Sequence, residues 1–319
     1  MINEISKTPS KIIRMKRNIR LYEILISSSL KRNVSNLAVT IIKYMFLFGL
    51  SFVFLFPFIY LLTTSVKYPS DLMDITKKWL VLNPAWGNYR KAMETMDYFN
   101  VLGKTVLIVG ICTVAQIFSC SFVAYGFARF KFKGRNLLFF TVILSIIVFP
   151  QVTLIPVYLQ FVNYGFIDTL LPFMIPCLFG LGLKGGLFVF IYRQYFIVLP
   201  EELEEAARID GCGPIKTFYT VILPVSGSVV LVTGILSVVW RWNDLTEPVY
   251  FLRFPEHFFI SSAVRNMDRL KDTYYSFTGM MTNPLAMAGT VMELIPVVIF
   301  FLIFQRKFMQ GVEHTGIKG

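Results

Sequence analysis

The chain has 319 residues, of which 55% are hydrophobic, with a mean hydropathy of +0.62 and a formal net charge of +12. This composition is too apolar for a soluble globular protein and predicts a polytopic membrane protein. The cations gather in short stretches beside apolar segments, which favours cytoplasmic loops and argues against a nucleic-acid partner.

The N-terminal residues 1–39 predict a basic cytoplasmic tail. This segment contains eight basic residues and two acidic ones. The basic residues are Lys7, Lys11, Arg14, Lys16, Arg17, Arg20, Lys31 and Arg32, and the acidic ones are Glu4 and Glu23. The first apolar run comes too late for a cleavable signal peptide and has no small-residue cleavage site. Residues 19–30 could form a helix lying in the membrane interface.

The first half of the chain predicts three membrane-spanning helices, at residues 41–63, 101–127 and 136–159. Between the second and third lies a short loop with four cations and no acid: Arg129, Lys131, Lys133 and Arg135. Basic loops stay in the cytoplasm, so this loop sets the orientation. The next loop, residues 160–169, has Asp168 and no cation and is expected outside.

The second half predicts three more spans, at residues 170–195, 225–250 and 285–304. The fourth is irregular, since Pro172 and Pro176 remove helix donors and four glycines surround Lys184. Such breaks are tolerated at membrane depth where neighbours or water satisfy the backbone, and Lys184 could bond freed carbonyls. The sequence thus predicts an all-α protein of about six transmembrane helices, with both termini cytoplasmic and no alternating barrel pattern.

Three regions follow from this reading. Residues 1–39 are the basic cytoplasmic tail, residues 40–308 the transmembrane domain including a polar loop at 200–224, and residues 309–319 a cytoplasmic C-terminal tail.

The polar loop predicts two short helices joined by a turn. Pro200 can begin a helix, and an acidic first turn suits the positive end of its dipole. Gly211 suits a left-handed helix end, and Pro214 begins a second helix that leads to Leu223-Pro224. An amphipathic helix lying on the membrane surface is the alternative, but anionic lipid attracts cations rather than these acids.

The same loop contains a spaced motif formed by Glu205, Ala206, Ala207, Gly211, Val221, Leu223 and Pro224. This motif resembles the cytoplasmic coupling loop of the membrane subunits of binding-protein-dependent ABC importers. The family usually has Ile where this chain has Val221, a conservative difference. The tract 240–244 and the ending 305–311 with 318–319 resemble carbohydrate-importer permeases, the maltose-type second permease in particular, as does the segment 83–89.

The resemblance implies a type I ABC importer permease fold in a bacterial cell membrane. It also implies a second, non-identical permease, two ATPase subunits, an extracellular solute-binding protein and surrounding membrane lipid as partners. The residues expected to couple to the ATPase are Glu201, Glu204, Glu205, Ala206, Ala207, Asp210, Gly211, Pro214, Leu223 and Pro224. In that family the C-terminal tail contacts the ATPases, which points to Gln310, Gly311 and Lys318.

Charged and aromatic side chains in the spans are candidates for the transport pathway: Trp240, Trp242, Asn243, Asp244 and Glu293. Two alternatives stay open. Glu293 could instead pair with another helix, and Asp244 could belong to an outer salt-bridge cluster with Arg241 and Glu247. Aromatic side chains in membranes also serve as packing or interface belts.

No phosphate-cradling GxxxxGK[ST] loop is present, so we expect no ATP site, no cofactor and no catalytic residue in this chain. The cysteines and the two histidines lack metal-ligand spacing, so no metal site is expected. A membrane-embedded enzyme and a self-sufficient secondary transporter are the alternatives. The sequence shows no hydrolase motif that would indicate an enzyme and no internal repeat that would indicate a secondary transporter. A sugar or oligosaccharide substrate rests on the resemblance, and polyol or glycerol-phosphate importers look similar.

Overall fold

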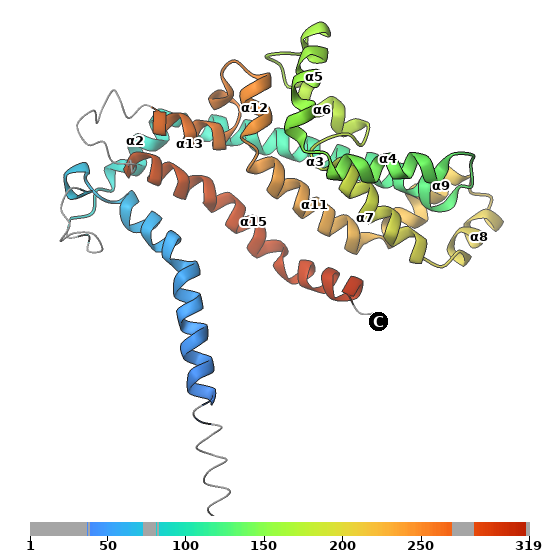
Figure 1. Ribbon diagram of the computed structural model, residues 1–319, viewed down its shortest axis with the longest axis horizontal. Helices are drawn as coiled ribbons and strands as arrows, with labels where there is room; N and C mark the ends of the chain where they lie inside the picture. The colour runs from blue at the N-terminus through green and yellow to red at the C-terminus, as the bar shows by residue number, and fades with distance from the viewer. Residues whose placement is uncertain (1–36, 38, 73–80, 82, 270–283, 317–319) are drawn as a thin grey trace, which may run out of the picture. The chain divides into compact units, whose positions relative to one another are not determined.

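The computed structural model describes residues 37, 39–72, 81, 83–269 and 284–316 (Figure 1). Within these residues the structure is helical and contains no strand, which confirms the predicted all-α class. The proposed interfacial helix at 19–30 and Lys318 lie outside the described residues. The chain divides into two compact units, Met1–Tyr60 and Leu61–Gly319.

The first predicted span appears as the apolar helix Val39–Ser65, most of which belongs to the first unit. Its large apolar side chains are exposed all round, among them Phe46, Phe48 and Phe54. A helix that is apolar on every side suits a lipid environment.

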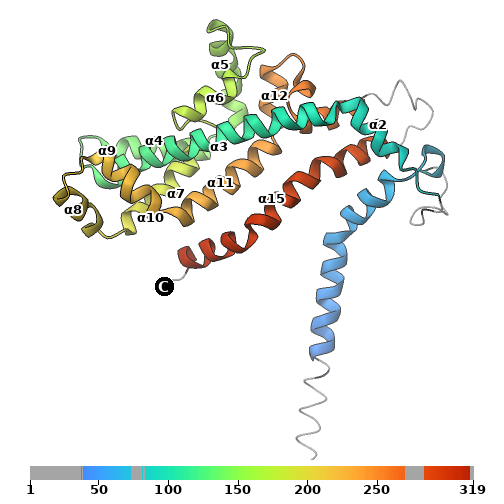
Figure 2. The same cartoon turned by 180° about the vertical axis from the view of Figure 1, so that it is seen from behind.

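In the second unit, α3 (Tyr98–Arg129) is the central helix and contacts α6 (Leu171–Leu178), α7 (Gly185–Val198) and α11 (Gly227–Trp242). At 32 residues it is long and apolar enough to cross a membrane. The short helix α2 (Gly87–Met96) lies at its N-terminal end, beyond the 3-10 turn η2 (Pro69–Leu72). Figure 1 shows α2 and α13 (Ile260–Arg269) toward one end of α3. Figures 1 and 2 show α8 (Glu202–Ile209) and α9 (Pro214–Thr217) at the other end.

The predicted third span is not one straight helix. It is divided into α4 (Arg135–Ile147) and α5 (Pro150–Asn163), which meet at 105°. The bend has a local cause, because Pro150 lacks an N–H and holds Phe149 in an extended conformation with ψ 129°.

The fourth span is irregular, as predicted, whereas the fifth differs from the prediction. The fourth is interrupted between α6 and α7, as the glycines suggested. The fifth ends early: α11 stops at Trp242, and the short helix α12 (Thr246–Phe251) and the 3-10 turn η5 (Pro255–His257) follow. The last span is the N-terminal part of α15 (Pro284–Gly316), which contacts α2, α11 and α13.

Among the described residues, three helices are each long and apolar enough to span a membrane, or five spans if each of two bent pairs counts as one. The predicted number of six is therefore not established by the helices themselves. The described residues of the second unit form three clusters of buried side chains. The cluster with the most buried aromatic rings joins α3 and α7 to the residues after α9 (Pro214–Thr217).

Candidate functional site

The polar loop between α7 and α11 folds as the predicted pair of short helices. After Pro200 the chain forms α8 (Glu202–Ile209), and Pro214 begins α9. A π-helical turn, η4 (Phe218–Ile222), and α10 (Leu223–Val225) then lead to α11 at an angle of 81°. Leu223 and Pro224 thus lie at the corner where the loop enters the membrane helix.

The turn after α8 is a Schellman motif. Gly211 has φ +77°, its N–H donates to the carbonyl of Arg208 at 3.0 Å, and the N–H of Cys212 donates to the carbonyl of Ala207 at 2.9 Å. The left-handed conformation predicted for Gly211 is confirmed. A Cβ atom added at Gly211 would meet nothing within 4 Å, so the backbone alone makes this position suit glycine.

An ion pair fastens the start of α8 to the end of α3. The Arg129 side chain is 9% exposed, and its Nε lies 2.6 Å from Oε1 of Glu204. The N–H does not point along this contact, so it is a charge contact rather than a hydrogen bond. Arg129 also donates a hydrogen bond of 2.7 Å to the carbonyl of Leu199 and lies 3.7 Å from the exposed carboxylate of Glu201.

Aromatic packing fastens the second half of the loop. Phe218 is fully buried, and its ring centre lies 5.3 Å from that of Tyr125 and 5.4 Å from that of Phe122, both on α3. Ile222 is fully buried in the same cluster. Both ends of the loop are therefore attached to α3, so α3 and the loop would move together.

The attached loop has an inner and an outer side. Ala207 is 5% exposed and Glu204 is engaged with Arg129, so these two predicted coupling residues face their own chain. The residues on the outer side are Glu201, Glu205, Ala206, Asp210, Gly211 and Pro214, which are exposed. Two apolar side chains accompany them, Ile209 at 87% exposed and Ile215 at 63%. A mixed acidic and apolar outer surface is suited to a protein partner.

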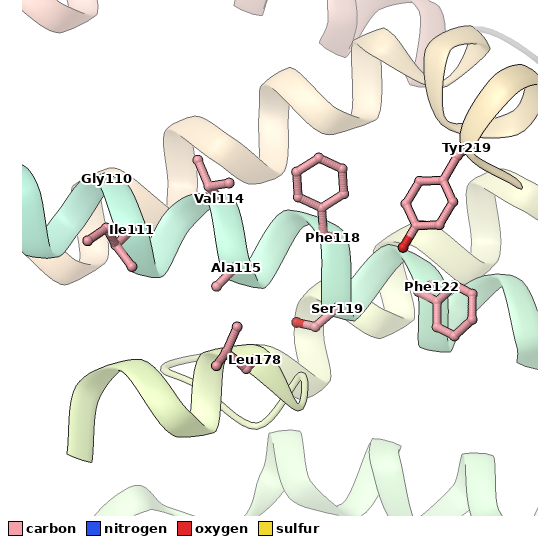
Figure 3. A pocket seen from close by; sticks show the side chains of 9 residues that line it. All are labelled: Gly110, Ile111, Val114, Ala115, Phe118, Ser119, Phe122, Leu178 and Tyr219. Atoms are coloured by element: carbon pink, nitrogen blue, oxygen red, sulfur yellow. The ribbon is translucent and has the colours of Figure 1, made fainter. Parts of the chain in front are cut away.

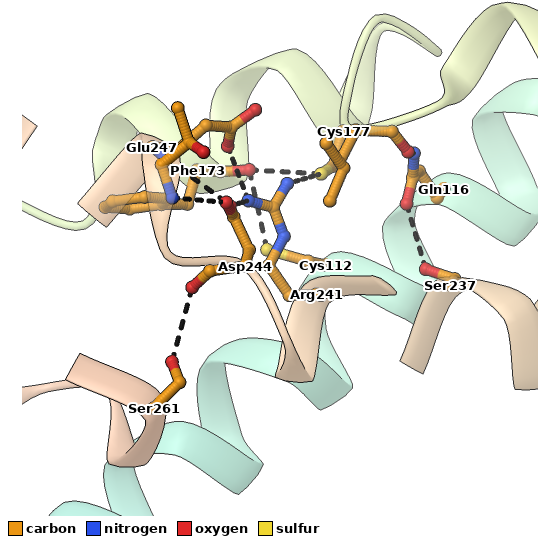
Figure 4. Close-up of polar contacts among 11 residues, drawn as sticks. Cys112, Gln116, Phe173, Cys177, Ser237, Arg241, Asp244, Glu247 and Ser261 are labelled. Carbon is orange, nitrogen blue, oxygen red and sulfur yellow. Dashed lines mark hydrogen bonds and ion pairs between the residues drawn. The ribbon is translucent and has the colours of Figure 1, made fainter. Parts of the chain in front are cut away.

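The predicted pathway residues do not form one group. Asp244 is 8% exposed and belongs to a buried cluster with Arg241 and Glu247, shown in Figure 4. The guanidinium of Arg241 lies 3.2 Å from Asp244 and 2.5 Å from Glu247. Oδ1 of Asp244 accepts the backbone N–H groups of Thr246 and Glu247, at the start of α12. This arrangement agrees with the salt-bridge alternative and holds α12 on the end of α11.

The other pathway candidates have different surroundings. Trp242 is 5% exposed in a core cluster, whereas Trp240 is partly buried and Asn243 is exposed. Glu293 on α15 is partly buried, and no basic side chain of the described residues lies within ion-pair distance. Gln310 and Gly311 belong to the helical backbone of α15, which continues into the predicted C-terminal tail as far as Gly316.

A polar network and a shallow groove border α3. Gln116 accepts a hydrogen bond from Ser237 at 2.9 Å and donates one to the carbonyl of Leu183 at 2.7 Å, so it joins α3, α11 and the α6–α7 break (Figure 4). The groove has a volume of about 650 Å³ and a mainly apolar lining (Figure 3). It is lined by Gly110, Ile111, Val114, Ala115, Phe118, Ser119, Phe122, Leu178 and Tyr219.

Sequence reasoning missed two features of the loop. The sequence marks Arg129 only as part of a basic cytoplasmic loop, and no neighbouring residue indicates its ion pair with Glu204 on α8. Ile209 and Ile215 are the second feature, because both are exposed on the outer side of the loop. An aliphatic residue in a short helix fits a buried position equally well, so the sequence alone does not mark them as surface residues.

A family model described as "Binding-protein-dependent transport system inner membrane component" matches residues 120–314. The arabinooligosaccharides transport system permease protein AraQ of Halalkalibacterium halodurans is 28% identical, with 85% of this chain and 93% of that protein covered. The melibiose/raffinose/stachyose import permease protein MelC of Bacillus subtilis is 30% identical, with 82% and 91% covered. The fold is similar to a chain in the crystal structure of a bacterial ABC transporter involved in alginate import. The TM-score is 0.72 at 20% identity, with 86% of this chain and 98% of that one covered.

Proposed function

Because the chain belongs to the family of binding-protein-dependent transport system inner membrane components, we propose that it is the permease subunit of an ATP-driven sugar or oligosaccharide importer. In this role the chain forms half of a translocation pathway and is a multi-pass membrane protein without catalytic residues of its own. The energy comes from two ATPase subunits, and the substrate from an extracellular solute-binding protein. A second, non-identical permease forms the other half of the pathway.

The observation that carries the proposal is the attachment of the α8–α10 loop. Its inner side is fixed to α3 by Arg129 and Phe218, while its outer side presents Glu205, Ala206 and Ile209. When a partner bound to the outer side moves, α3 and α11 therefore move with the loop, because the loop is joined to both helices. We propose that ATPase closure reaches the pathway by this route, with the loop and both termini in the cytoplasm.

A glycine series tests the proposal in the complete importer, purified through a tag on this chain. Gly211→Val places a β-branched residue at φ +77°, which costs at least about 1–2 kcal/mol and disturbs the end of α8. We expect substrate-stimulated ATP hydrolysis to fall about tenfold or more, with membrane insertion retained. Gly211→Asn should keep most of the activity, because Asn tolerates the left-handed region.

Gly213→Ala is the matched control. Gly213 lies two residues away with φ −73°, and an added Cβ atom there also meets nothing within 4 Å. Its substitution should leave ATP hydrolysis and assembly unchanged. Wild-type assembly and stimulation in Gly211→Val would show that this loop does not couple to an ATPase.

A further inference from the structure

The break between α6 and α7 lies beside the middle of α3, a helix long and apolar enough to cross a membrane. Gln116, which is near the midpoint of α3, donates its hydrogen bond to Leu183 inside the break. Since α3 is long enough to span the bilayer, a residue bonded to its midpoint is near the bilayer centre. Lys184 is the next residue in the chain and the residue that precedes α7.

Lys184 is not needed to satisfy the backbone of the break. Gln116 occupies the carbonyl of Leu183, and Oγ of Ser119 donates to the carbonyl of Cys177 at 2.6 Å. Among the described residues, the Lys184 ammonium has neither a hydrogen bond nor an ion pair, and the residue is exposed. The carbonyl-bonding role predicted for this lysine is therefore filled by two α3 side chains.

The backbone of Lys184 is in the left-handed region, with φ +62° and ψ +20°. Glycine would adopt this conformation without strain, and the break already contains glycine at 180, 182, 185 and 186. A strained non-glycine residue at a helix break is a reason to look for a function of its side chain.

An aromatic ring lies beside this cation. The Lys184 ammonium is 5.9 Å from the ring centre of Trp240 on α11, and Trp240 stacks on Phe188 with 5.7 Å between centres. An exposed cation at membrane depth is unfavourable in lipid and normally faces a water-filled path or an anion. One cation–π contact at this distance offsets only part of the unfavourable solvation.

From this geometry, and on the basis of the function proposed above, we infer that Lys184 and Trp240 form a subsite for a saccharide carrying an anionic group. The exposed part of the Trp240 ring packs against the sugar ring. The Lys184 ammonium pairs with a carboxylate or phosphate of the same molecule. The importer would thus carry acidic saccharides, and the charge would be recognised midway along the pathway.

The test uses the complete importer in proteoliposomes and compares three probes, galactotriose, trigalacturonate and glucose 6-phosphate. We expect the wild-type complex to be stimulated by at least one of the two anionic probes. Lys184→Gln should raise the half-maximal concentration of that probe about tenfold or more, and Lys184→Arg should restore much of the response. The uronate and the phosphate distinguish the two sources of negative charge.

Two further variants protect the interpretation. Lys184→Gly removes the charge and relieves the backbone strain, so it should fold well and still lose the anionic response. Lys104→Gln is the matched control, because Lys104 also lies over an aromatic ring, 5.1 Å from the centre of Phe258, but far from the break. We expect it to leave the half-maximal concentration of the anionic probe within about twofold of wild type.

Several results would overturn the inference. One is an importer stimulated only by galactotriose, and another is an anionic response that Lys184→Gln leaves intact. Loss of the second permease on purification of Lys184→Gln would show that the cation pairs with a subunit carboxylate instead. In the first two cases substrate still stimulates ATP hydrolysis, so the inference about Lys184 fails while the proposed permease function stands. If no ATPase co-purifies with the chain, both the proposed function and this inference fail.

Discussion

Removing the carboxylate of Glu204 should loosen the attachment of the α8–α10 loop without altering its outer surface. Breaking one partner of a buried ion pair costs about 3–5 kcal/mol. The cost is smaller at this site because Glu204 is 15% exposed. In addition, Arg129 keeps its hydrogen bond to the carbonyl of Leu199 and its contact with Glu201. We therefore expect Glu204→Gln to destabilise the loop attachment by about 2 kcal/mol, which is about a 30-fold change in the local opening equilibrium.

Hydrogen–deuterium exchange of the purified chain measures this opening directly. Amides of α8 and of its Schellman turn should exchange about 30-fold faster in Glu204→Gln, while the amides of central α3 should keep their rates. Glu202→Gln is the matched control, because Glu202 lies in the same first turn and is exposed. Its exchange should stay within about threefold of wild type. Equal rates in Glu204→Gln and Glu202→Gln would refute the view that Arg129 anchors the loop.

Two further predictions concern topology and catalysis. Cys212 is partly exposed while Cys112, Cys120 and Cys177 are buried, so an impermeant maleimide should label Cys212 in inside-out vesicles but not in intact cells. Labelling from the outside would invert the proposed orientation. The purified chain alone should neither bind nor hydrolyse ATP, because its sequence holds no phosphate-cradling loop, and turnover that persists after removal of every partner ATPase would contradict this.

Local sequence was enough for the features that depend on neighbouring residues. Apolar runs predict helices because a backbone in lipid must satisfy its own hydrogen bonds. Pro200, Gly211 and Pro214 fixed the order of helix, turn and helix, since each restricts its own backbone angles. The motif that contains Gly211 also led to the permease family, which the family comparison then confirmed.

Sequence reasoning was less successful where a proline could either bend a helix or begin one. The predicted third span runs through Pro150, whereas in the structure α4 ends at Ile147 and Pro150 begins α5. The predicted fifth span runs past Trp242, where α11 ends. The sequence suggests a salt-bridge cluster of Arg241 with Asp244 and Glu247, but the burial of that cluster depends on packing against other helices.

Local sequence therefore predicts which segments are helical and apolar, and where the α8–α10 loop turns. Which side chains meet depends on packing in three dimensions: Arg129 with Glu204, Gln116 with Leu183, and Lys184 with Trp240. The reason is physical. A membrane helix that is apolar on every side has no polar face to reveal its orientation, so packing against neighbouring helices sets its rotation and the partners of its few polar groups.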